Sequence, residues 1–259
     1  MRYINLAMLQ QNLEAIRSDF NSKKHFRYTV IENLLSGPAA EKIYESYPSI
    51  QDGLWDGTTY INQKNKFQKT EFEEGSPMAG IFRELNCPEF LLWLGQVTGI
   101  EEMLPDQDLF GGGLHQSING AFLNVHVDYN IHPKTNYHRR LNVLIYMNKD
   151  WKDEYEGHLE LWNITDDSQE LLEKISPDFN RCVIFETNEL SFHGHPKPLK
   201  TPPGINRKSI ATYYYTKGRP AKETASAHNT IYVNTEGVKG QAKKLSSGVK
   251  AFLERINKK

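Results

Sequence analysis

The sequence predicts a mainly β protein, a double-stranded β-helix or jelly roll of the cupin type with flanking helices. Apolar residues recur at helical intervals only in about the first hundred residues and again near the C-terminal end. From Phe110 onward, short β-branched and aromatic runs alternate with glycines and turn residues. No long helical crossover separates these runs, which favours an antiparallel sandwich over a parallel α/β sheet.

The N-terminal third is expected to alternate helices and short strands, in the order helix 4–21, strand 27–31, helix 36–47, strand and loop 55–67, and helix 78–97. Apolar side chains at steps of three and four predict the first helix. Ser36 is a suitable N-cap for the second helix, and Pro48 is expected to end it. The Cys87-Pro88 pair should interrupt the third helix, because proline removes a helical hydrogen bond.

The remaining residues are expected to form the strands of the jelly roll, at 111–115, 121–127, 141–147, 158–162, 182–186 and 209–216. An acidic insertion at 164–180 is predicted to carry a short helix at 169–175. A closing amphipathic helix is predicted over 245–256. No repeat or linker divides the chain, so we expect one domain over 1–259, with a helical support region at 1–105, a jelly-roll core at 106–218 and a C-terminal extension at 219–259.

Composition excludes several partners. The 31 lysines and arginines nearly balance 32 aspartates and glutamates, which argues against nucleic acid as a partner. Cys87 and Cys182 lie far apart, which indicates neither a disulfide framework nor a thiolate zinc site and suits a reducing cytoplasm. No leader and no membrane-spanning run is evident, so the protein is expected to be cytoplasmic and without a membrane partner. No heptad repeat indicates an oligomeric state.

His126 and Asp128 are the first chemically informative pair. They lie two residues apart on a predicted strand, so their side chains point to the same face. One imidazole and one carboxylate form two thirds of the facial triad that holds non-haem Fe(II). Taken alone, such a pair is far more often a hydrogen-bonded His/Asp pair at a strand end, so the interpretation depends on a second histidine.

That histidine is available in the segment Ser191–Pro196, which follows the strand at 182–186. His193 is the preferred third ligand, and His195 is an alternative. Further along, Arg207 begins the last predicted strand. A buried arginine there needs an anionic partner, and its guanidinium suits the distal carboxylate of a dicarboxylate cosubstrate.

The order His126-x-Asp128, His193, Arg207 resembles that of the Fe(II)/2-oxoglutarate-dependent oxygenases, specifically the branch of prolyl 4-hydroxylase-like enzymes that includes the hypoxia-type prolyl hydroxylases. The stretch Arg139–Trp151 is similar to that branch's arginine-containing strand, which ends in Tyr-Leu-Asn-x-x-Trp. The stretch Glu156–Trp162 is similar to the glycine pair and Leu-x-Leu that follow it. The resemblance covers about residues 110–216.

The resemblance implies that His126, Asp128 and His193 bind Fe(II), with no catalytic side chain beyond these ligands. It also implies that Arg207 pairs with the 5-carboxylate of 2-oxoglutarate, with Tyr146 as a phenol donor and Ser209 as a weaker candidate. Two positions depart from the pattern. His158 replaces the second glycine of the pair, and His195 stands where a valine is common. His115 and Asn124 flank the metal strand and are further candidates to face the cavity.

The implied activity is hydroxylation of a substrate with release of succinate and CO2. The triad leaves three positions open on Fe(II), of which 2-oxoglutarate would take two and O2 the last, and ascorbate is a further candidate cofactor. Asp128 fills the position that a halogenase leaves for chloride. A prolyl residue of a peptide or protein and a small molecule are both expected substrates, and the basic loop Tyr129–Arg140 is the expected contact. The alternatives are an oxygen or 2-oxoglutarate sensor, a non-catalytic cupin-like metal-binding protein and a zinc hydrolase.

Overall fold

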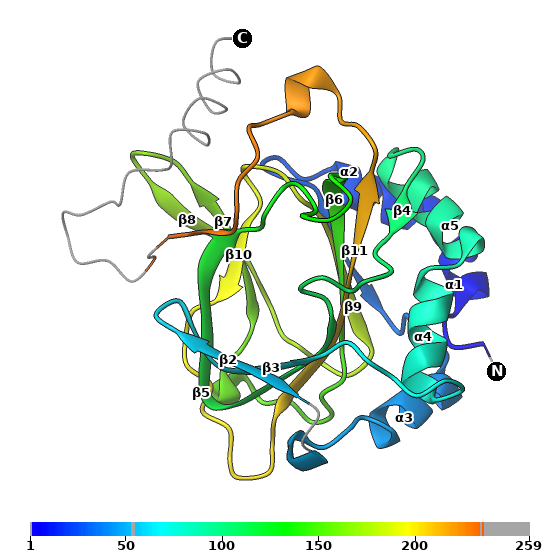
Figure 1. Ribbon diagram of the computed structural model, residues 1–259, viewed down its shortest axis with the longest axis vertical. Coiled ribbons are helices and arrows are strands. Elements are labelled where there is room, and N and C mark those ends of the chain that lie inside the picture. The colour runs from blue at the N-terminus through cyan, green and yellow to red at the C-terminus, as the bar shows by residue number, and fades with distance from the viewer. Residues whose placement is uncertain (1, 53–54, 234, 236–259) are drawn as a thin grey trace.

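The computed structural model describes residues 2–52, 55–233 and 235. Within these residues an antiparallel sheet curls on itself, in the strand order β1-β9-β6-β11-β5-β10-β7-β8. Helices cover one side of it (Figure 1). The main strands are β1 (Tyr28–Glu32), β5 (Gly113–Val127), β6 (His138–Tyr146), β7 (Leu159–Ile164), β8 (Gln169–Ile175), β9 (Arg181–Glu186), β10 (Phe192–His195) and β11 (Arg207–Thr216). This is the predicted jelly-roll class; the predicted closing helix at 245–256 lies outside the described residues.

β5 joins the two halves of the curled sheet. Its first part pairs with β11 and its last part pairs with β10, so one strand of 15 residues belongs to both halves. The sequence predicted two separate strands here, and that division was wrong. The polar residues Gln116 and Ser117 stay in the strand because they pair with β11 on one side and β3 (Gln63–Lys69) on the other.

Shorter strands complete the sheet. β2 (Asp56–Tyr60) forms a hairpin with β3, β4 (Leu104–Pro105) pairs with β11, and β12 (Ile231–Tyr232) pairs with the end of β5. Single 3-10 turns lie at Ile50–Asp52, Asp153–Tyr155 and Ala221–Glu223. Both β3 and β12 therefore lie against β5, the strand that carries His126.

β8 corrects the helix predicted at 169–175. The segment is a strand that pairs antiparallel with β7, after a turn in which the Thr165 amide donates to the Ser168 carbonyl. A seven-residue helix is marginal in water because its nucleation is costly. Pairing with β7 instead satisfies the backbone groups of the segment in register.

The helices are α1 (Leu6–Gln11), α2 (Leu13–Asn21), α3 (Gly37–Glu45), α4 (Pro77–Leu85) and α5 (Pro88–Thr98). The break predicted at Cys87-Pro88 is confirmed, since Pro88 begins α5. The single helix predicted over 4–21 is instead two, because the Asn12 side-chain amide donates to the Met8 carbonyl and competes with the backbone there. No helix in the described part of the chain is long and apolar enough to cross a membrane.

Successive side chains of β6 point to opposite faces of the sheet, one face toward the apolar core and the other toward the cavity. Leu141, Val143 and Ile145 point outward and pack with the helices in the largest buried apolar cluster. Asn142 and Tyr146, on the opposite face, line the interior of the curled sheet. The helices thus hold the outer face of the sheet rigid, while its inner face is free to carry polar groups.

Candidate active site

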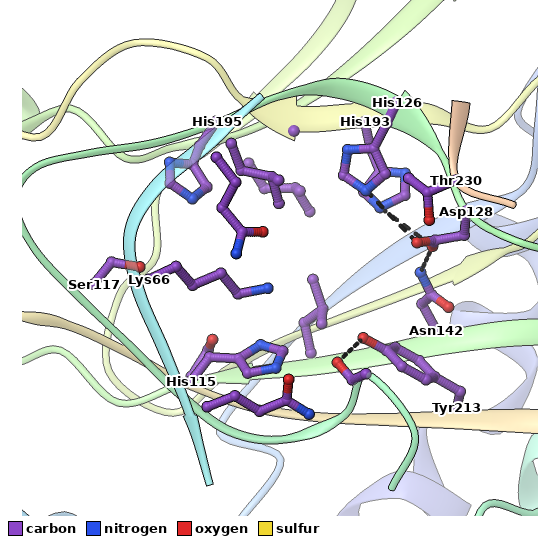
Figure 2. A pocket seen from close by; sticks show the side chains of 18 of the residues that line it. Lys66, His115, Ser117, His126, Asp128, Asn142, His193, His195, Tyr213 and Thr230 are labelled. Atoms are coloured by element: carbon purple, nitrogen blue, oxygen red, sulfur yellow. Dashed lines mark hydrogen bonds and ion pairs between the residues drawn. The ribbon is translucent and has the colours of Figure 1, made fainter. Parts of the chain in front are cut away.

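Three ligand-type side chains meet inside the curled sheet. His126 lies near the end of β5, Asp128 follows that strand, and His193 on β10 is the register partner of His126. Their ligand atoms all lie within 4.8 Å of one another. The Nε2 atoms of His126 and His193 lie 3.6 and 3.5 Å from the Asp128 carboxylate oxygens. Figure 2 shows the three side chains close together on one side of the cavity. Two imidazoles and one carboxylate on one side of a point form a facial metal site.

Backbone carbonyls orient both imidazoles. Nδ1 of His126 lies 2.8 Å from the Asn124 carbonyl, and Nδ1 of His193 lies 2.8 Å from the Ser191 carbonyl. Donation from Nδ1–H leaves Nε2 unprotonated and able to bind a metal. Burial, together with the neighbouring His126, lowers the pKa of His193 to about 4, so this ring is neutral at physiological pH.

Asp128 is held by two further side chains. Its Oδ2 forms an ion pair with Arg139 at 3.0 Å and accepts a hydrogen bond from Asn142 at 2.8 Å. The Arg139 guanidinium in turn donates to Asn142 Oδ1 and stacks 3.5 Å from the centre of the Tyr213 ring. Burial alone would raise the pKa of Asp128, but the Arg139 charge and the two histidines hold it well below its usual value. The carboxylate is therefore ionised and fixed in orientation before any metal binds.

The triad opens into a cavity of about 300 Å³ that also contains Arg207, Tyr146 and Ser209. Arg207 Nε donates to the Gly157 carbonyl at 2.6 Å, and its guanidinium lies 4.9 Å from the Tyr146 ring centre. The Tyr146 hydroxyl is buried, and neither it nor Arg207 has an acidic partner among the described residues. An arginine and an unsatisfied phenol at one end of a cavity fit a bound carboxylate.

The absence of a side chain at Gly157 leaves space for the Arg207 side chain. The φ of Gly157, +74°, is in the left-handed region, and a side chain there would collide with Leu199 and Arg207. The adjacent His158, which departs from the expected glycine, is buried and contacts Asp153 at 2.8 Å. It does not line the cavity.

The other predicted residues fall into two groups. His195 and His115 line the cavity, and Figure 2 shows both at a distance from the triad. His193, not His195, completes the cluster of ligand atoms. Asn124 does not line the cavity, but its carbonyl orients His126.

The loop Tyr129–Arg140, the expected substrate contact, contributes only Tyr129 and Arg139 to the cavity lining. His132 is buried, with its ring 3.8 Å from the Asp106 carboxylate. Lys134 is exposed and pairs with Asp108. His132 and Lys134 are therefore engaged outside the cavity, by an acid of the core and by an acid at the surface.

The sequence did not predict a role for residues 224–233, which we call the strap. The strap lies against β5, the strand that carries His126. Thr230 and Tyr232 of the strap line the cavity, and β12 within it pairs with β5 beside His126. Asn130 holds the strap through Ser226 and His228. His228 also forms an ion pair, at 2.7 Å, with the buried carboxylate of Glu189. Only the apolar run Ile231-Tyr232-Val233 signals such a strand in the sequence.

We expect the strap to loosen as pH rises. Burial lowers the pKa of His228, but the hydrogen bond and charge of Glu189 outweigh this and raise it overall. The ion pair therefore stabilises the strap fully below the unfolded-state pKa, and that stabilisation is lost as pH rises through the raised folded-state value. Hydrogen exchange of the Ile231 to Val233 amides, corrected for intrinsic rates, should be faster at about pH 8.5 than at about pH 6.

His228→Gln is the control for the strap. It keeps a side chain that can hydrogen-bond Glu189 but cannot become charged. Its corrected exchange should be fast and nearly independent of pH. A wild-type strap with pH-independent exchange would contradict the expectation.

Comparison with known proteins agrees with this geometry. A family model described as 2OG-Fe(II) oxygenase superfamily matches residues 112–215, the range that contains the triad and Arg207. Prolyl 3-hydroxylase OGFOD1 of Mus musculus is 25% identical over 158 residues, which are 60% of this chain and 27% of that protein. The chain thus spans about a quarter of the length of that relative.

Solved structures share the fold. A prolyl hydroxylase from Trichoplax adhaerens, in complex with a peptide of the hypoxia inducible factor oxygen degradation domain, has a TM-score of 0.58 at 18% identity, covering 81% of this chain and 92% of that one. A Pseudomonas putida prolyl-4-hydroxylase has a TM-score of 0.56 at 15% identity, covering 80% and 100%. The chain is therefore similar to the 2OG-Fe(II) oxygenase superfamily over residues 112–215, the part that contains the His-Asp-His cluster, and it shares the fold of these structures.

Proposed function

We propose that the protein is an Fe(II)- and 2-oxoglutarate-dependent dioxygenase that hydroxylates a prolyl residue or a small molecule and releases succinate and CO2. The observation that carries this proposal is one cavity with a His-Asp-His cluster and an arginine without an acidic partner. His126, Asp128 and His193 would hold the iron. Bound together, Fe(II) and 2-oxoglutarate supply the oxidising power from O2, with ascorbate as an auxiliary reductant.

Arg207 and Tyr146 would receive the 5-carboxylate of the cosubstrate. Their support is that the guanidinium has no acidic partner among the described residues and that the Tyr146 hydroxyl is buried beside it. Ser209 lines the same end of the cavity and is the weaker donor. Arg139 and Asn142 contact Oδ2 of Asp128 and would hold this carboxylate in place beside the two histidines when the metal binds.

The substrate is proposed at the level of its class. A prolyl residue is supported by the names of the related proteins, two of which are described as prolyl hydroxylases with this fold. A small molecule is supported by the cavity volume of about 300 Å³, at the lower limit of ligand pockets. The helices and the sheet share one buried core, which supports a single domain, and the free thiols of Cys87 and Cys182 support a cytoplasmic location.

Anaerobic titration tests the proposal. Fe(II) followed by 2-oxoglutarate should produce the visible charge-transfer band of an iron-bound 2-oxo acid. A zinc hydrolase or a non-catalytic metal-binding protein would give no such band. Substrates are then sought by screening peptides and metabolites for stimulated succinate release, and a sensor would show the band with only slow release.

Arg207→Met should weaken 2-oxoglutarate binding by about 10- to 100-fold, the effect of losing a hydrogen bond to a charged group worth about 1.5–3 kcal/mol. The midpoint of the charge-transfer titration measures it. Fe(II) affinity should be unchanged, because Arg207 does not contact the triad. Arg181→Met is the matched control, since Arg181 pairs with Glu32 at the surface. Equal 2-oxoglutarate affinity in the two variants would remove Arg207 from the proposal.

A further inference from the structure

A second unpaired cation enters the same cavity. Lys66 extends from β3, and Figure 2 shows its ammonium group directed into the cavity between His115 and His195. Asp128 is the single carboxylate among the described residues that line the cavity. The ion pairs of Asp128 go to Arg139, His126 and His193, and none goes to Lys66. Within the part of the chain that the structure describes, Lys66 therefore points inward without an ion-pair partner.

An irregularity in β3 directs Lys66 inward. The pairing of β3 with β5 shifts register between Lys64 and Lys66, and Asn65 between them has a φ of +53°. The shift places both Gln63 and Lys66 on the cavity side. Lys64 remains exposed, as a lysine side chain usually is. Lysine normally extends its ammonium group to water, so the inward position of Lys66 needs an explanation.

The residues that line the cavity carry more positive than negative charge, which favours the binding of an anion. Arg139, Arg207 and Lys66 face the one carboxylate of Asp128, which leaves two net positive charges. The charge of Fe(II) and that of dianionic 2-oxoglutarate cancel, so the excess persists when both are present. Arg139 is paired with Asp128, and Arg207 suits the cosubstrate. Burial lowers the pKa of Lys66 to about 8, and at neutral pH the amine is still mostly charged.

Two histidines complete a polar site around Lys66. His115 and His195 are only 7% and 6% exposed, and each has a ring nitrogen without a hydrogen-bond partner, Nε2 of His115 and Nδ1 of His195. β3 holds His115 close, because Gln68 is its register partner and Lys66 pairs with Ser117. Buried polar atoms without partners usually mark a place for a ligand or water. Figure 2 shows the two rings on either side of the Lys66 ammonium group, in the part of the cavity away from the triad.

We propose that Lys66, flanked by His115 and His195, binds a carboxylate or phosphate group of the substrate, so that the enzyme acts on a small acidic metabolite. This inference rests on the proposed function and narrows its substrate class. The cavity must hold both 2-oxoglutarate and the substrate, which limits the acid to the size of a metabolite. The anion at Lys66 and the metal at the triad would fix which carbon faces the oxidant.

Binding measurements on protein loaded anaerobically with Fe(II) and 2-oxoglutarate test the inference without turnover. The probes are small amino and hydroxy acids, their neutral amides, and phosphate monoesters of the corresponding alcohols, each titrated by calorimetry. Acids or phosphate esters should bind, and the amides should bind at least about 10-fold more weakly. The series that binds identifies the anion as carboxylate or phosphate.

Lys66→Met should lower the affinity for the acid or phosphate ester that binds by about 10- to 100-fold, the effect of losing a hydrogen bond to a charged group. Lys66→Arg should retain much of the affinity, and Lys64→Met, on the exposed side of the same strand, should retain all of it. Lys66→Met should also leave the 2-oxoglutarate titration nearly unchanged. This result would distinguish Lys66 from Arg207, because replacing Arg207 should weaken the binding of 2-oxoglutarate.

Three results would overturn the inference. A tenfold loss of 2-oxoglutarate affinity in Lys66→Met would show that Lys66 binds the cosubstrate and not the substrate. Amides that bind as well as acids would remove the need for an anion, and so would a panel in which no acid or phosphate ester binds. A wild-type protein without the charge-transfer band would instead defeat the proposed function, so the two failures are distinguishable.

Discussion

Replacing His193 with alanine should abolish stable Fe(II) binding and, with it, 2-oxoglutarate-dependent succinate formation. His193 supplies one of the three ligand atoms that lie within 4.8 Å of one another. The loss of metal affinity should exceed the 10- to 100-fold change that typically follows mutation of a residue that only orients a ligand. Competition with a metal indicator under anaerobic conditions measures the affinity.

His195→Ala is the matched control for this experiment. His195 lies two residues away on the same strand and faces the same cavity, but its ring is outside the ligand cluster. The variant should bind Fe(II) as the wild type does. If His195→Ala lost the metal and His193→Ala kept it, the assignment of the third ligand would have to be reversed.

Replacing Arg139 with methionine should destabilise the metal-free protein by about 3–5 kcal/mol, the cost of removing one partner from a buried ion pair. The change leaves the Asp128 carboxylate without its cation and Asn142 Oδ1 without its main donor. Urea unfolding measures the change. Bound Fe(II) should restore part of the lost stability, because the metal replaces the missing positive charge beside Asp128.

Lys134→Met provides the comparison for Arg139. Its ion pair with Asp108 is at the surface, where solvent screens the charges, so its loss should change stability little. An Arg139→Met protein as stable as Lys134→Met in the absence of metal would show that the Arg139 to Asp128 pair contributes nothing to the fold. If Fe(II) did not reduce the destabilisation of Arg139→Met, the metal would not replace the positive charge of Arg139 beside Asp128.

Most of the helices and strands could be predicted because the spacing of apolar residues along the chain indicates them. Leu141, Val143 and Ile145 alternate with pocket residues along one strand, and the apolar spacing around Cys87-Pro88 marks two helices. The two errors in the strand region have one cause. The continuity of β5 through Gln116 and Ser117, and the strand conformation of β8, come from hydrogen bonds to neighbouring strands, which local patterns do not contain.

The sequence by itself determined the jelly-roll class and the chemistry of the metal site, because His126 and Asp128 share a strand face and His193 and Arg207 follow in a recognisable order. Only the tertiary structure brought Lys66 into the cavity, placed Arg139 on Asp128 and laid the strap beside His126. The physical reason is that these contacts depend on strand register and on a bulge at Asn65. Register is set by pairing between distant segments, so a shift of one residue would turn Lys66 outward without changing the sequence.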